Sequence, residues 1–238
     1  MKTQKKIKLK IVKLGMAGML FGFWTMAAFA QISSDCNFSI SLNQTVPDDS
    51  YSGVSVTENV TGLNSPIANI TITLDIANGY NGDLYGYLRG PNGGFAVLLN
   101  RTGVTGSDGF GYSDSGFNVT FNDSANFNNI HFYQEDTYQL NGNGQLTGTW
   151  SSDGRAVDPM ADPATLASTL PSASLNSFDG TDPNGTWTLF LADLSAGGQS
   201  TLLGASLDIQ IVPEPSAWAM LGMGLAIFLI SRKRASHS

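Results

Sequence analysis

The chain has 238 residues, of which only 13% are charged, and its formal net charge is −7. The charge is unevenly distributed, because residues 31–212 hold three arginines, no lysine and 18 of the 19 carboxylates, which gives this region a net charge of −15. Such a region repels nucleic acid and anionic lipid surfaces, so we exclude nucleic acid as a partner. It favours cations, Ca²⁺ above all, although an acidic surface can also simply keep a protein soluble. Cys36 is the only cysteine, so the domain must fold without an intramolecular disulfide.

The N-terminal 30 residues have the three parts of a secretory signal peptide. Six lysines precede an apolar stretch from Leu14 to Trp24, and Ala28 and Ala30 frame an A-x-A cleavage site. We therefore predict a signal peptide over residues 1–30, cleaved after Ala30 by signal peptidase. The alternative is an uncleaved membrane anchor, which is disfavoured because the apolar stretch is shorter than the roughly 20 residues that a span requires.

Residues 50–211 have the pattern of an all-β domain. From Ile70 to Ile76 apolar and polar residues alternate, which is typical of a strand with one buried face. The segments that we expect to form strands are residues 52–60, 67–76, 82–88, 95–99, 117–121, 187–191 and 202–211. Turns rich in Gly, Asn, Asp and Pro separate them, and this spacing predicts a jelly-roll-like β-sandwich. Residues 31–49 form an N-terminal lead-in in this interpretation, and the only helix-permissive stretch of the domain is at residues 163–169.

The segment between residues 103 and 180 is predicted to form long loops. It is rich in Gly, Ser, Asp and Asn, yet it carries many aromatic side chains. These are Phe110, Tyr112, Phe117, Phe121, Phe127, Phe132, Tyr133, Tyr138 and Trp150. We interpret most of them as anchors that pack into the core and hold the loops in place. The alternative is that exposed rings line a carbohydrate-binding groove.

Residue types limit the catalytic hypotheses. A Ser-His-Asp triad would have to be built on His131, because the other histidine, His237, lies in the C-terminal tail. The sequence contains no G-x-S-x-G elbow, no H-E-x-x-H helix and no Gly-rich phosphate loop. The many carboxylates leave a glycosidase-like acid pair open. We predict that the chain is not an enzyme.

The C-terminal tail has the order of parts of a sorting signal. Val212, Pro213, Glu214 and Pro215 are followed by an apolar run, predicted to form a short transmembrane helix at about 216–231. The basic end consists of Arg232, Lys233 and Arg234. This tail, residues 212–238, resembles the PEP-CTERM sorting signal of Gram-negative bacteria. The resemblance implies recognition by a membrane-embedded exosortase, anchoring in the inner membrane before processing, and delivery to the cell surface or to an extracellular polysaccharide matrix.

Three passages resemble a second family. They are NGDLYGYLRGPNGG at 81–94, FNDSA at 121–125 and the stretch from Leu175 to Ile211. They are similar to the P domain that follows the catalytic domain in subtilisin-like proprotein convertases. The residues matched to fold-defining positions are Gly82, Asp83, Leu84, Pro91, Gly185, Trp187 and Asp193. The chain departs from the family at Ala205, where a tryptophan is usual, and over 127–163, which looks like an insertion or a divergent loop.

The P-domain resemblance implies a module without catalytic residues, since the convertases carry theirs in another domain. A serine peptidase label attached to the family would therefore not imply a triad here. The matched residues also have a simpler interpretation as turns and strand starts.

The sequence leaves three functions open. The first is an exported, non-enzymatic protein of the cell surface or matrix. The second is a Ca²⁺-binding or glycan-binding adhesin or protease-accessory module, and the third is a hydrolase. No cofactor is predicted, and no EF-hand loop or G-G-x-G-x-D repeat is present. The aspartates that could contribute to a Ca²⁺ site are Asp83, Asp108, Asp114, Asp123, Asp179, Asp182 and Asp193.

Overall fold

The computed structural model of the chain describes residues 35–124, 126–212, 222, 224 and 227. Backbone contacts divide the chain into Met1–Gln31 and Ile32–Ser238, and all the described residues belong to the second unit. The predicted signal peptide, with Ala28 and Ala30, lies outside the described residues. The same holds for the predicted sorting residues other than Val212.

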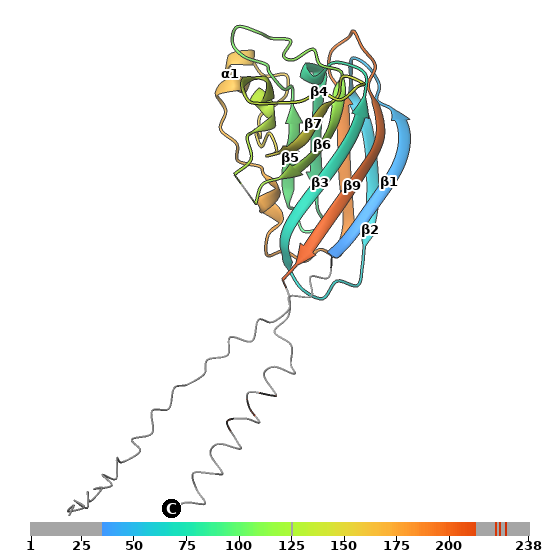
Figure 1. Ribbon diagram of the computed structural model, residues 1–238, viewed down its shortest axis with the longest axis vertical. Coiled ribbons are helices and arrows are strands. Elements are labelled where there is room, and N and C mark those ends of the chain that lie inside the picture. The colour runs from blue at the N-terminus through green and yellow to red at the C-terminus, as the bar shows by residue number, and fades with distance from the viewer. Residues whose placement is uncertain (1–34, 125, 213–221, 223, 225–226, 228–238) are drawn as a thin grey trace, which may run out of the picture. The chain divides into compact units, whose positions relative to one another are not determined.

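The described part of the chain forms two β-sheets that pack face to face (Figure 1). The first sheet has the strand order β1 (Asp35–Thr45), β9 (Thr201–Ile211), β3 (Ile67–Ala77), β6 (Gly116–Asn122) and β7 (Leu146–Trp150). The second has the order β2 (Ser50–Val60), β8 (Gly185–Asp193), β4 (Leu84–Arg89) and β5 (Phe95–Asn100). Neighbouring strands are antiparallel except β6 and β7, which are parallel. The predicted all-β sandwich is confirmed.

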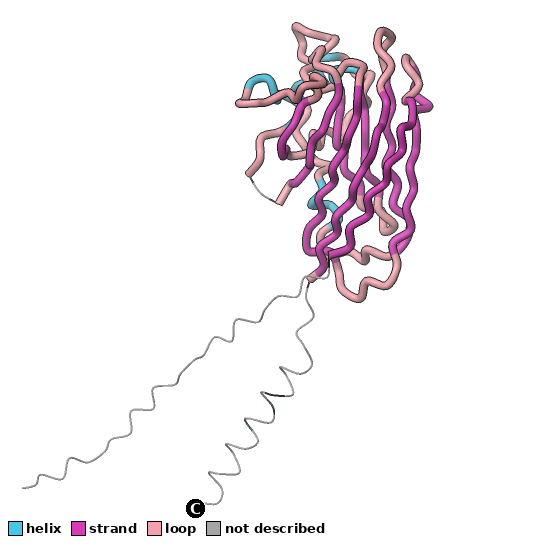
Figure 2. Tube along the Cα trace, turned by 45° about the vertical axis from the view of Figure 1, so that its right-hand side comes forward, coloured by secondary structure: helices cyan, strands magenta, loops and turns pink. Residues whose placement is uncertain are grey.

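The core lies between the two sheets and follows the alternation seen in the sequence. In β3, Ile70, Ile72, Leu74 and Ile76 are buried, while the residues between them are partly exposed. The opposite sheet contributes buried side chains such as Trp187 on β8. A tube view shows the strands of both sheets running along the same long direction (Figure 2). Burial of one face of each sheet is the main source of stability in such a fold.

The first sheet begins within the segment that we expected to be a lead-in. β1 pairs with β9 from Asp35 to Thr45, with a register shift between Ser41 and Gln44. Phe38 is partly buried against the core, as is Leu42 farther along the strand. The alternation of polar and apolar residues in this segment therefore has the same cause as in β3, although its apolar side chains are only partly buried, since β1 is an edge strand.

Short helices occupy the connections. They are η1 (Asn81–Asp83), η2 (Ile130–Glu135), α1 (Pro163–Ser168) and η3 (Leu175–Phe178). The α-helix lies in the predicted helix-permissive stretch, and the Asp162 carboxylate caps it by accepting from the N–H groups of Ala164 and Thr165. None of the helices among the described residues is long and apolar enough to cross a membrane. The predicted transmembrane helix at 216–231 falls almost entirely outside those residues.

Candidate functional site

The Gly82-Asp83-Leu84 motif forms η1 and the start of β4. The Gly82 N–H donates to the Tyr112 carbonyl at 2.8 Å, so the loop after β5 lies directly against this turn. A Cβ added at Gly82 would collide with the Phe110 carbonyl oxygen. A glycine is therefore required here by close backbone approach.

The Pro91 turn and the Gly185-Trp187 segment meet at the other end of the second sheet. Gly185 has φ +129°, and a Cβ there would lie 2.5 Å from Cβ of Pro91. Trp187 is 2% exposed, and its indole N–H donates to the Pro183 carbonyl at 2.9 Å. Its ring packs on Phe178, with the ring centroids 5.0 Å apart. These contacts give the matched residues a role in the fold, without a ligand.

Asp83 and Asp193, the two acidic residues of the motifs, lie together. Asp193 ends β8 and is opposite Leu84 in the register of β4, next to Asp83. The Leu194 N–H donates to the Asp83 carbonyl at 2.9 Å. We call Asp48, Asp83 and Asp193 the carboxylate cluster, because Asp48 precedes β2 where that strand pairs with Asp193.

The carboxylate cluster is largely buried and incompletely hydrogen-bonded. Asp83 is 5% exposed and Asp193 is 0% exposed. Oδ2 of Asp193 accepts from the Ser200 hydroxyl at 3.0 Å, whereas its Oδ1 has no hydrogen-bond partner. Oδ1 of Asp48 is also buried without a partner, and its Oδ2 accepts from the Gly197 N–H at 3.4 Å.

Burial dominates the electrostatics of the carboxylate cluster. It raises the pKa of Asp193 to about 6, and the negative charges of Asp83 and Asp48 act in the same direction. Burial likewise raises the pKa of Asp83, against hydrogen bonding to Ser195 and the positive charge of Arg101. Protonation or a bound cation would each reduce the repulsion between the buried carboxylates of Asp83 and Asp193 and the half-buried carboxylate of Asp48.

The other predicted calcium ligands lie apart and hold loops together. Within the described residues, no three His, Cys, Asp or Glu side chains converge closely enough to hold a metal ion as they stand. Asp114 accepts from the Tyr133 hydroxyl, and Asp108 accepts from the N–H groups of Phe110 and Gly111. The Asp182 carboxylate hydrogen-bonds to Asn184.

Asp123 and Asp179 complete the set of predicted ligands. Asp123 accepts from the N–H and the hydroxyl of Ser152 and from the N–H of Leu175. Burial raises the pKa of Asp179. The structure therefore brings together only two of the seven predicted aspartates, Asp83 and Asp193, and adds Asp48. In the sequence Asp48 looks like an ordinary turn residue after Pro47, which is why it was missed.

His131 lies at the centre of a buried polar network. Its Nδ1 is 2.7 Å from Oδ2 of Asp153, and its Nε2 is 3.1 Å from the Val104 carbonyl oxygen. Oδ1 of Asp153 accepts from Nη1 of Arg155 at 3.2 Å, and the same nitrogen donates to Oδ1 of Asn129. Neither ring nitrogen of His131 is left to activate a serine. The network fastens η2 to the loop after β7 and to the loop after β5.

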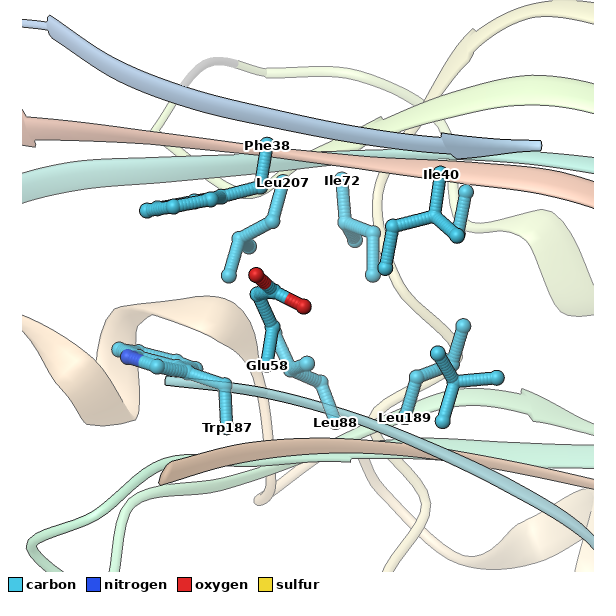
Figure 3. Close-up of a pocket in the computed structure, with 10 residues that line it drawn as sticks. Phe38, Ile40, Glu58, Ile72, Leu88, Trp187, Leu189 and Leu207 are labelled. Atoms are coloured by element: carbon cyan, nitrogen blue, oxygen red, sulfur yellow. The ribbon is translucent and has the colours of Figure 1, made fainter. Parts of the chain in front are cut away.

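A small cavity opens between the two sheets. Figure 3 shows Phe38 and Leu207 of the first sheet facing Trp187 and Leu88 of the second, with the Glu58 carboxylate projecting between them. Its volume is about 40 Å³, enough for a few water molecules only. Ligand sites are usually several times larger, so this cavity is a packing defect at the open edge of the sandwich.

The aromatic residues of segment 103–180 divide between core and surface. Four are buried, namely Phe117, Phe121, Tyr133 and Trp150. Three are exposed, with exposed fractions of 82% for Phe110, 39% for Phe127 and 37% for Tyr138. The other two are half-buried: Tyr112 packs against the core, and Phe132 contacts the His131 ring and lies under the Arg155 guanidinium. Most of the nine rings therefore pack inward, as predicted, and three do not.

The C-terminal end of the chain matches a family model for the PEP-CTERM protein-sorting motif over residues 212–234. The match spans all the predicted sorting residues, from Val212 to Arg234, and it begins directly after β9. The chain is therefore a two-sheet β-sandwich protein that carries a PEP-CTERM motif. That motif marks an exported protein sorted by an exosortase.

Comparison with solved structures finds the serine protease of Aeromonas sobria, alone and in complex with its chaperone. The sequence identities are 14% and 13%, and the TM-score is 0.40 for both. The matched regions cover 76% and 75% of this chain but 27% of the protease chain in each case, so the chain spans about a quarter of the protease. Comparison with curated proteins finds no match.

Proposed function

We propose that this chain is a non-enzymatic protein of the cell surface or the extracellular matrix of a Gram-negative bacterium. The observation that carries the proposal is the PEP-CTERM motif at residues 212–234, which begins where the last strand of the sandwich ends at Ile211. In this proposal the β-sandwich is the exported domain, and the C-terminal tail is its sorting signal. Signal peptidase and exosortase are the processing partners in this proposal, and the tail anchors the chain in the inner membrane before processing.

Two structural observations support a non-enzymatic role. Both ring nitrogens of His131 are engaged by Asp153 and by the Val104 carbonyl, and the ring is 0% exposed. Several exposed carboxylates of the loops cap turns, as Asp108 and Asp182 do. A hydrolase built on these groups would have to break contacts that hold the loops.

Expression of the full chain in hosts with and without an exosortase tests the sorting proposal. We expect a shorter, surface or extracellular form only in the host with exosortase. The variant P213A/P215A should stay in the membrane fraction at its original size in both hosts, whereas the control variant Arg89→Ala should behave as the natural chain. The same size and location of the natural chain in both hosts would overturn the proposal.

A second candidate function is Ca²⁺ binding at the carboxylate cluster. We infer it from the buried and unpartnered Oδ1 of Asp193, since a carboxylate oxygen is the ligand type that Ca²⁺ prefers. Asp48 is half-buried in a turn, and its negative charge acts on Asp193. Backbone carbonyls and water would supply the remaining ligands.

Thermal unfolding of the chain in EDTA and in CaCl₂ tests this candidate. We expect CaCl₂ to raise the melting temperature, and the increase to be lost in Asp193→Asn and reduced in Asp48→Asn. The control Glu135→Gln changes an exposed carboxylate and should keep the full increase. An equal increase in all four proteins, or none in the natural chain, would exclude the site.

A further inference from the structure

An open groove runs along the outer edge of β7, in the segment that departs from the P-domain pattern. We call it the β7 groove; its lining residues are Asn126, Phe127, Asn128, Thr137, Tyr138, Gln139, Thr147, Gly148, Thr149 and Trp150. Its volume is about 390 Å³, which lies within the range of ligand-binding clefts. β7, labelled in Figure 1, is an edge strand of the first sheet. The groove therefore lies at the margin of the sandwich.

Hydrogen bonds to β7 hold both walls of the β7 groove. On one side the Thr147 N–H and hydroxyl both donate to the Gln139 carbonyl, at 2.9 Å and 3.0 Å. On the other side the Ser151 N–H and hydroxyl donate to the carbonyls of Asn128 and Phe127, each at 2.9 Å. The groove is therefore a built feature of the fold, with its walls attached to the strand that forms its floor.

Aromatic rings occur on both walls and under the floor. Phe127 and Tyr138 are exposed on opposite walls, with exposed fractions of 39% and 37%. Trp150 lies beneath them at 5% exposure, and its indole N–H donates to the Thr147 carbonyl at 3.0 Å. The Tyr138 ring is held edge-on by the buried Tyr133 ring, at a centroid distance of 5.5 Å. A ring that is already positioned binds a ligand at a lower entropic cost.

The polar lining of the β7 groove is uncharged. Its polar lining residues include Asn126, Asn128, Gln139, Thr137 and Thr149, which carry amides and hydroxyls, and none of its lining residues is acidic or basic. This is unusual in a domain whose net charge is −15. Amides and hydroxyls both donate and accept hydrogen bonds, which suits a ligand rich in hydroxyl groups. Aromatic rings with an apolar face suit the C–H faces of sugar rings.

An extended peptide is a poorer fit to the same groove. Peptides add to sheet edges through a continuous run of free backbone groups. Along β7 the backbone at Thr147 is already bonded to Gln139, and Ser151 just beyond the strand is bonded to Asn128. Between the two walls, only the short stretch around Gly148 and Thr149 could offer backbone groups to a peptide.

We propose that the β7 groove binds a neutral polysaccharide through Phe127, Tyr138 and the surrounding amides and hydroxyls. This inference deepens the proposed surface function, because a matrix protein that binds glycan would be retained in the matrix after release from the membrane. It requires no particular route of export. Binding is measured on the purified chain, so its failure would leave the sorting test untouched.

Affinity gel electrophoresis of the full chain in detergent tests the proposal, with dextran, laminarin, hydroxyethyl cellulose or galactomannan in the gel. We expect at least one of these to retard the chain. Tyr138→Ala and Phe127→Ala should each weaken binding roughly tenfold, as is usual when an aromatic anchor is truncated. Tyr51→Ala and Phe110→Ala are the matched controls, because they remove rings that are 63% and 82% exposed elsewhere, and they should bind as the natural chain.

A second pair of variants changes an exposed residue of the groove, so that a loss of binding does not depend on the packing of the aromatic rings. Thr149 is exposed on the floor of the β7 groove, so Thr149→Arg should block it and abolish binding, while Thr149→Ser should retain it. The proposal is overturned if no neutral polysaccharide retards the chain, or if Thr149→Arg binds as well as Thr149→Ser. Alginate in the gel tests an acidic polysaccharide, and unfolded casein tests an extended peptide. Retardation by only one of these two would also overturn the proposal.

Discussion

Asp193 shows how the position of a side chain changes its chemistry. In the sequence it is one aspartate among many, in a stretch that resembles a strand end. In the structure it lies at 0% exposure within reach of two other carboxylates, and burial raises its pKa to about 6. The resemblance-based prediction assigned Asp83 and Asp193 to the fold, and the carboxylate cluster gives them an electrostatic role as well.

The raised pKa of Asp193 predicts a pH dependence of stability. The folded chain binds this proton more tightly than the unfolded chain, so the stabilisation is present below the ordinary value of 3.8 and is lost as the pH rises through about 6. The substitution Asp193→Asn removes the charge, so this variant should exceed the natural chain in unfolding free energy at about pH 7.5, by up to about 3 kcal/mol.

Urea unfolding in EDTA at several pH values measures this difference. Near pH 4 the two proteins should be similar, because most of the carboxylate is then protonated in the folded chain. A difference that stays constant between about pH 4 and pH 7.5 would contradict the assignment of the raised pKa to Asp193.

The sequence predicted strands where one face is buried. β3 and β9 lie close to the expected ranges, because a continuous alternation of apolar and polar residues has a simple local cause. β7 was missed, since Leu146 to Trp150 contains a glycine and only its two end residues are buried. Its parallel pairing with β6 joins segments about 30 residues apart, which local periodicity does not reveal. The sequence therefore offered a carbohydrate-binding groove only as an alternative, without placing it at β7.

Asp123 is predicted to hold the end of β6 against the loops beside it. Its carboxylate accepts from the N–H groups of Ser152 and Leu175, both at 2.7 Å, and from the Ser152 hydroxyl. Asp123→Ala leaves these part-buried donors without a partner and should lower the unfolding free energy by about 2 kcal/mol. Asp162→Ala removes the cap of the exposed helix α1 and should cost about 1 kcal/mol.

Chemical unfolding followed by tryptophan fluorescence compares these two variants. Both remove one carboxylate, so the comparison separates the loss of the loop connection from the loss of charge. If Asp123→Ala were no less stable than Asp162→Ala, the proposed role of Asp123 would be wrong.

At the scale of the whole molecule, the acidic and the basic residues lie in different parts of the chain. The region 31–212 carries a net charge of −15, while the lysines lie in the predicted signal peptide and in the basic end of the tail. Removal of those segments in processing would leave a strongly acidic domain. Self-repulsion at such a charge reduces the stability of the compact state.

Added salt is therefore expected to stabilise the protein. Raising NaCl from about 10 mM to about 0.5 M shortens the range of charge repulsion and should raise the melting temperature by a few degrees. The double variant E135Q/D136N has two fewer exposed negative charges, so its increase should be smaller. Calorimetry at both salt concentrations measures these shifts, and a decrease in the natural chain would refute the repulsion argument.

The sequence by itself determined the PEP-CTERM motif and the fold class, and it predicts the signal peptide. The signal-peptide pattern, the PEP-CTERM tail and the period-two alternation are local patterns, and each depends on residues that are neighbours in the chain. Only the tertiary structure decided which polar groups act together. Asp48, Asp83 and Asp193 come from three segments, and the two walls of the β7 groove come from residues before and after η2. These sets form because sheet pairing and loop hydrogen bonds bring distant segments into contact, and no local pattern encodes that contact.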